Sequence, residues 1–103
     1  MRKNILIPHL NYMVYVRPLV PDPKEPETEA YVDLESRHHC VMYLKRKCLP
    51  PTVAHEITHV LQHLCETRSM RFTEESEHMG YLMQYLMQQI LGYEFEDKIP
   101  KVK

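Results

Sequence analysis

The segment His55-Glu56-Ile57-Thr58-His59 has the form H-E-x-x-H, whose side chains could bind a metal ion. On an α-helix, residues four apart lie on one face with their Cβ atoms roughly 5–6 Å apart, so both histidines could give a ring nitrogen to one zinc ion. Glu56 lies about 100° round the helix from His55, too far to be an equal ligand but near enough to take a proton from a metal-bound water. The motif therefore predicts zinc ligands at His55 and His59 and a general base at Glu56.

A catalytic zinc ion needs a third protein ligand and an open position for water. His63 continues the spacing, but three ligands in a row along one helix cannot easily surround an ion, so we expect His63 at the surface or behind the ligands. The metzincin pattern needs a glycine at position 62 and a histidine at position 65, and this chain has Gln62 and Cys65, which excludes that class.

The remaining candidates for the third ligand are acids of a second predicted helix. Glu77 is favoured because it shares a side with Gly80, and a glycine there would let the two helices approach closely. The alternatives are Glu74 and Glu75.

Two helices are predicted to position these residues. Pro50 and Pro51 open the first, because proline is tolerated in the first turn of a helix. The second is predicted to begin at Thr73, whose hydroxyl can cap it, and to end at Gly92. Apolar residues recur every three or four positions and predict the core-facing stripes: Val53, Ile57, Val60, Leu61 and Leu64 in the first helix, and Met79, Leu82, Met83, Leu86, Met87 and Ile90 in the second.

The residues before these helices are typical of strands. Segment 11–17 is rich in β-branched and aromatic residues, and segment 29–35 alternates between apolar and polar residues. Segment 18–26 contains four prolines and is predicted to be a loop. Segment 38–45 follows a short polar turn, so it is predicted to form a hairpin with 29–35.

These elements predict an α+β fold in which a small antiparallel sheet of about three strands is followed by two packed helices. A chain of 103 residues has the length of one domain, which we expect to cover residues 1–103. Its strand-rich part would be 1–48, its helical, metal-binding part 49–92, and a charged, flexible tail 93–103.

The composition narrows the classes of partner. Thirteen Lys and Arg against fourteen Asp and Glu leave no excess of cations to neutralise nucleic-acid phosphates. No apolar run approaches the ~18–20 residues of a membrane helix, and Pro8 ends the short apolar start. Three cysteines without paired spacing suit a reducing compartment. We therefore expect a cytoplasmic protein with no nucleic-acid partner and no membrane partner.

Residues 50–90 resemble the small gluzincin-type metallopeptidase-like proteins that are often encoded in phage genomes. The resemblance lies in the sequence around the H-E-x-x-H motif, from Pro50 to Gln62, and in the downstream run Glu77-His-Met-Gly-Tyr81. In that family the downstream helix carries E-x-x-(small)-Tyr.

The resemblance implies a minimal zincin-like fold, with His55, His59 and Glu77 as the ligands of Zn²⁺ and Glu56 as the general base. It also implies that Cys40–Leu44 is an edge strand on which an extended peptide could lie. A phage-encoded protein of this kind would act in the host cytoplasm.

Two functions stay open. The first is a zinc-dependent metallopeptidase of minimal gluzincin type, in which Glu56 takes a proton from zinc-bound water and the hydroxide attacks a peptide bond. Its substrate would be a peptide or protein held on the edge strand through backbone hydrogen bonds. The second is a catalytically silent protein-binding module, in which zinc staples a small fold and the partner is a host or viral protein.

Overall fold

The computed structural model describes residues 2–71 and 74–92 of the chain. These residues form a four-stranded sheet, a short 3-10 helix and two α-helices, which confirms the predicted α+β class. Neither α-helix is long and apolar enough to cross a membrane. The predicted cap at Thr73 and the predicted tail at 93–103 lie outside the described residues. The elements are β1 (Lys3–Ile7), η1 (Pro8–Leu10), β2 (Tyr12–Pro18), β3 (Ala30–Asp33), β4 (His39–Leu44), α1 (Pro50–Thr67) and α2 (Ser76–Leu91).

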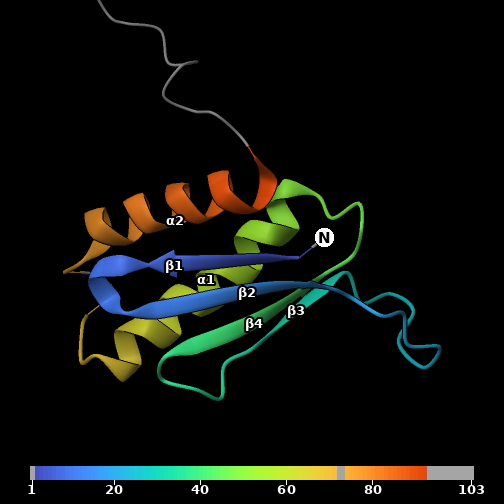
Figure 1. The fold of residues 1–103 in the computed structure, drawn as a ribbon, viewed down its shortest axis with the longest axis horizontal. Helices are drawn as coiled ribbons and strands as arrows, with labels where there is room; N and C mark the ends of the chain where they lie inside the picture. The colour runs from blue at the N-terminus through green and yellow to red at the C-terminus, as the bar shows by residue number, and fades with distance from the viewer. Residues whose placement is uncertain (1, 72–73, 93–103) are drawn as a thin grey trace, which may run out of the picture.

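The strand order in the sheet is β1-β2-β4-β3 (Figure 1). β1 pairs with β2 and β3 pairs with β4 in antiparallel fashion, whereas β2 and β4 in the centre are parallel. The expected antiparallel arrangement is therefore confirmed at the two outer pairings and wrong at the central one. The physical reason is the connection from Leu19 to Glu29, which carries the chain to the far edge before β3 begins. β4 then returns between β3 and β2 and runs alongside β2.

Strand β4 is consequently an interior strand, and the expectation that Cys40–Leu44 offers a free edge is wrong. Cys40 lies opposite Val14 of β2, and Leu44 lies opposite Ala30 of β3. The two edge strands of the described sheet are β1 and β3.

Strand β1 is the element that the sequence pattern did not reveal. Ile5 and Ile7 point into the core, where they are 4% and 1% exposed, but the outward residue between them, Leu6, is also apolar and 44% exposed. The alternation typical of a strand is therefore hidden. The chain turns from β1 into β2 through η1, and Asn11 adopts a left-handed φ of 48°, which asparagine tolerates better than most residues.

Both helices contribute to the same core as the inward face of the sheet. The predicted stripe of α1 is confirmed, since all five of its residues are buried. In α2 the predicted residues Met83 and Met87 are only half-buried, whereas the other four are buried. The inward side chains of the sheet that are buried with them are Ile5, Ile7, Tyr12, Val14, Val16, Cys40, Met42 and Leu44.

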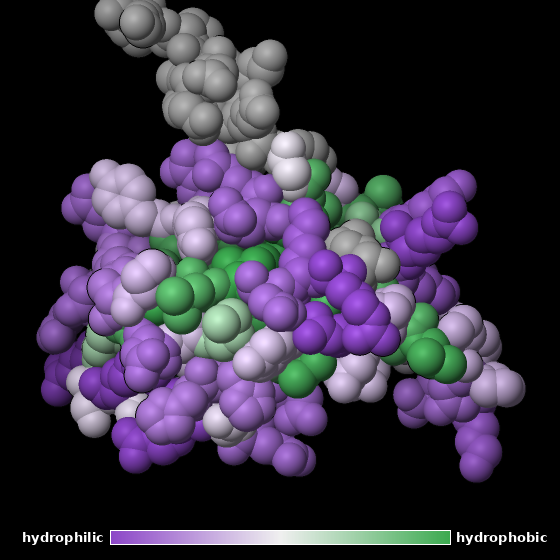
Figure 2. Space-filling view, viewed as in Figure 1, coloured by the Kyte–Doolittle hydropathy of each residue, from purple (hydrophilic) through white to green (hydrophobic). Residues whose placement is uncertain are grey.

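Neither α1 nor α2 covers the other face of the sheet, which carries aromatic side chains. The rings of Tyr31 and Tyr43 are stacked with centroids 4.6 Å apart, and Tyr15 contacts His39 edge to face at 5.7 Å. Figure 2 shows one face of the molecule, on which hydrophilic side chains surround smaller apolar areas.

The two edges of the sheet differ in what covers them. Helix α2 lies along β1, where the Tyr85 hydroxyl donates a hydrogen bond to the Leu6 carbonyl oxygen at 2.9 Å. The Lys3 ammonium donates to the carbonyl oxygens of Gln89 and Ile90 at 2.6 and 3.1 Å, a favourable place for a cation because these carbonyls end the helix. In the described part of the chain, no comparable hydrogen bond reaches the backbone of Ala30–Asp33 from outside the sheet. The edge of β3 is therefore open.

Candidate metal centre

The H-E-x-x-H motif lies in the first half of α1, as predicted. Pro50 stands in the first turn, where its missing N–H costs no helical hydrogen bond. The buried stripe of α1 faces the sheet, so His55 and His59 fall on the exposed side of the helix. The helix thus presents both imidazoles to solvent.

The two imidazoles face each other at a separation that suits a metal ion. The Nε2 atoms of His55 and His59 are 3.2 Å apart, and the ring planes stand at 85° to each other. Two nitrogens bound to one zinc ion at ~2.0–2.1 Å with a tetrahedral angle of about 109° would be about 3.3 Å apart. The observed separation is therefore close to that of two nitrogens that share a zinc ion.

Glu56 lies beside the histidines but is buried, at 7% exposure. Its carboxylate makes no hydrogen bond and no ion pair with any residue that the structure describes. Burial, followed by the charges of Glu29 and Glu56, raises the pKa of the Cys48 thiol. The negative charge of Glu56 thus acts on Cys48, which lies two positions before α1.

Glu77 is not brought together with the two histidines. The Cys65 sulfur lies 3.7 Å from the Met79 sulfur, so the start of α2 lies beside a position on α1 that is six residues, or about 9 Å, beyond His59. Glu77 precedes Met79 by two residues, so it points about 200° away from the side of α2 that meets α1, and it is exposed. Within residues 2–71 and 74–92, no three His, Cys, Asp or Glu side chains form a group that could hold a metal ion.

The expected close approach at Gly80 is wrong. Gly80 is exposed, and a Cβ atom placed on it would meet no atom within 4 Å. The two alternative acids each face a cation or a histidine: Glu74 lies 3.5 Å from the Arg71 guanidinium, and Glu75 lies 3.7 Å from Nδ1 of His78.

His63 is half-buried, and its ring contacts the segment after β3. Its Nε2 donates to the carbonyl oxygen of Ser36 at 3.0 Å, and since a carbonyl oxygen only accepts, this contact requires the proton on Nε2. His63 therefore ties α1 to the segment that follows β3.

A second pair of histidines was not predicted. Nε2 of His9 in η1 lies 2.7 Å from Nε2 of His78 in α2, beside a small hollow that Tyr81 and Tyr85 help to line. The two residues are far apart in the sequence, so no local spacing could have revealed them.

The predicted site residues thus divide into a pair that the fold assembles, His55 and His59, a buried neighbour, Glu56, and a distant acid, Glu77.

Comparisons with protein-family models, with curated proteins and with solved structures find no match to this chain.

Proposed function

We propose that the chain is a zinc-dependent metallopeptidase of minimal gluzincin type that acts on peptides or proteins. The observation that carries the proposal is the 3.2 Å separation between the Nε2 atoms of His55 and His59 on the exposed side of α1. Imidazole nitrogen is a preferred zinc donor, and the separation is within about 0.1 Å of that in a tetrahedral site. In the absence of a metal ion, one imidazole would donate a hydrogen bond to the other across the same separation.

Glu56 has the properties of a general base in this proposal. When bound, zinc would polarise the scissile carbonyl and acidify a water molecule. The carboxylate of Glu56 has no partner in the described part of the chain, so it is free to accept the proton of that water and to return it to the leaving amine. Its burial keeps bulk water from competing for that proton.

The proposal keeps Glu77 as the third ligand, with Glu74 and Glu75 as the alternatives. Because Glu77 points away from α1, this role requires the first turn of α2 to rearrange when zinc binds. Metal binding would then be coupled to the position of α2, since the ion supplies the free energy for that rearrangement.

A catalytically silent, zinc-stapled protein-binding module is the second candidate. It is favoured by the finding that only two of the three expected ligands come together, since a site with fewer protein ligands than a catalytic zinc centre could still staple a small fold.

Zinc titration of the metal-free protein by calorimetry tests the proposal. We expect one equivalent to bind to the wild type and to His38→Ala, a matched control that removes an exposed histidine outside the site. Mutation of a residue that only hydrogen-bonds to a metal ligand typically weakens metal binding roughly 10–100-fold. Because His59 is itself a proposed ligand, His59→Ala should weaken zinc binding by more than that. Equal affinity in the wild type and His59→Ala would contradict the proposed centre.

Cleavage of a peptide library separates the two candidates. Glu56→Gln should fold and bind zinc but cleave nothing, because the amide cannot take up the proton. A wild type that binds zinc and cleaves no member of the library would favour the binding module.

A further inference from the structure

The open edge of β3 offers backbone groups that an incoming strand can use. The Lys45 N–H donates to the Glu29 carbonyl oxygen at 3.0 Å, so this pair of residues is hydrogen-bonded across the hairpin. In an antiparallel ladder the bonded positions alternate, so Tyr31 and Asp33 also bond toward β4, and Ala30 and Val32 direct their N–H and C=O groups to the free edge. These groups are positioned to bind an extended chain.

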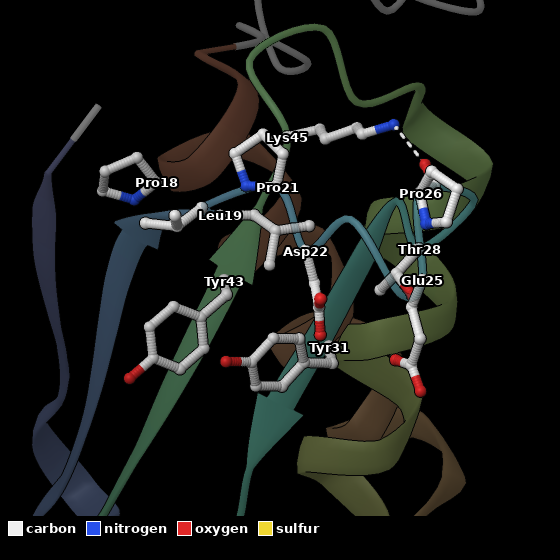
Figure 3. A pocket seen from close by; sticks show the side chains of 11 residues that line it. Pro18, Leu19, Pro21, Asp22, Glu25, Pro26, Thr28, Tyr31, Tyr43 and Lys45 are labelled. Carbon is white, nitrogen blue, oxygen red and sulfur yellow. Dashed lines mark hydrogen bonds between the residues drawn. The ribbon is translucent and has the colours of Figure 1, made fainter.

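Two hollows lie beside β3 on the open face of the sheet, and both are lined by carboxylates. The first, of about 460 Å³, lies between Tyr31, Tyr43 and the proline-rich loop that carries Asp22 and Glu25. In Figure 3 the Tyr31 ring lies between the Tyr43 ring and the Glu25 carboxylate. The one cation of this hollow, Lys45, turns its ammonium away to Pro26 and Glu29, at 3.3 and 3.5 Å.

The second hollow, of about 250 Å³, lies at the other end of β3. Asp33 and Glu35 line it, together with His39. Neither carboxylate forms an ion pair with a Lys or Arg among the described residues. Tyr31 and Asp33 are two residues apart, which corresponds to about 7 Å along a strand. Side chains two positions apart on an added strand would therefore reach the two hollows.

The opposite side of an added strand would face α1. Ala30, Val32 and Leu34 point to this side and are only half-buried, whereas the inward residues of the interior strands are almost fully buried. The edge thus leaves apolar surface that an apolar side chain could cover.

Strand β3 also lies beside α1, the helix that carries the proposed metal centre. The Cys48 thiol, two positions before α1, lies 3.8 Å from the Glu29 carbonyl oxygen, and His63 of α1 is hydrogen-bonded to the Ser36 carbonyl oxygen. The second contact places His63, four residues beyond His59 on α1, beside the segment that follows β3.

We propose that the free edge of β3 binds the substrate, and that this substrate is an extended peptide in which apolar residues alternate with lysine or arginine. The inference rests on the proposed function, because it identifies the substrate class of that site. The apolar residues would face α1, and the cations would enter the two carboxylate-lined hollows. Acidic side chains on an exposed edge also repel the same edge of a second copy of the protein. The test must therefore distinguish attraction of a cationic peptide from this repulsion between copies.

Binding is measured by fluorescence anisotropy with the Glu56→Gln variant, which prevents turnover, in the absence of metal. The probes are labelled peptides of alternating lysine and valine, of alternating glutamate and valine, and of lysine and valine in two separate blocks. We expect only the first to bind, and its affinity should fall as the salt concentration rises. Binding of the glutamate peptide with equal affinity, or of no peptide, would overturn the proposal.

Two protein variants test where the peptide lies. Val32→Pro removes an N–H that points away from β4, so the β3–β4 ladder should survive while peptide binding is lost. Asp33→Asn combined with Glu35→Gln should weaken binding about fivefold, and Glu66→Gln, which removes an exposed charge elsewhere on α1, should not. If Val32→Pro leaves the affinity for the lysine–valine peptide unchanged, the edge is not the peptide site. The same conclusion follows if the variant instead dissociates a dimer in which two copies of the protein pair through this edge.

These measurements are independent of the zinc titration and of the cleavage assay. Peptide binding without zinc uptake would remove the proposed function and leave the edge as a binding site. If the protein binds zinc and cleaves peptides with and without lysine equally well, the proposed function stands and the inference is overturned.

Discussion

Removal of the Tyr12 hydroxyl is expected to stabilise the protein, whereas the same change at Tyr85 is expected to destabilise it. Tyr12 is fully buried and its hydroxyl has no hydrogen-bond partner in the described part of the chain. The neighbouring polar group is the Cys40 thiol, and sulfur accepts and donates hydrogen bonds only weakly. A buried hydroxyl without a partner carries a desolvation penalty of about 1–3 kcal/mol, so Tyr12→Phe should raise the free energy of unfolding by about 1 kcal/mol.

Tyr85→Phe is the matched variant, because it loses the bond to the Leu6 carbonyl oxygen and should lower the free energy of unfolding by about 1 kcal/mol. Urea denaturation followed by circular dichroism gives both values. In a domain of this size the two changes correspond to shifts of about 4–8 °C in Tm with opposite signs. A Tyr12→Phe variant that is destabilised as much as Tyr85→Phe would show that the buried hydroxyl is well satisfied and would refute the reasoning.

Three further predictions concern α2, the buried thiol and the metal. Gly80→Ala should stabilise the protein by about 1 kcal/mol in urea denaturation, because the site is helical and the new Cβ meets no neighbour; destabilisation would show that α2 packs differently. Burial raises the pKa of the Cys40 thiol from 9.0 to about 12, so the stability that it contributes is complete below pH 9. In the Tyr12→Phe background, the free energy of unfolding measured in urea should fall between pH 9 and 12 by about 1.4 kcal/mol per pH unit, and Cys40→Ala should reduce that slope. Zinc at 100 times its Kd should add about 2.7 kcal/mol of stability in a melting experiment, and EDTA or His59→Ala should abolish the gain.

The helices were predictable because their apolar residues follow the helical repeat closely. Val53, Ile57 and Leu64 all lie in the buried stripe of α1, and the exposed position of His55 and His59 follows from that stripe alone. The juxtaposition of the two imidazoles was therefore a local property of one helix, and a sequence pattern is sufficient to specify it.

The remaining features depend on long-range pairing. The central β2–β4 pair depends on where the loop from Leu19 to Glu29 delivers the chain, and no residue type encodes that path. Glu77 was chosen by its side of a helix, but the rotation of α2 about its axis is set by Met79 packing beside Cys65. A pattern within one element cannot fix its orientation against another.

The parallel pairing at the centre of the sheet also shapes how the chain can fold. The β1–β2 and β3–β4 hairpins are each closed by contacts between nearby residues, so they carry a small loop-closure entropy. Val14 and Cys40, which are 26 positions apart in the sequence, must then meet, and neither hairpin has a complete hydrophobic face before they do. Docking of the two hairpins is thus the event that creates the core, and the helices, which follow the strands in the sequence, have no finished surface to pack against until it has happened.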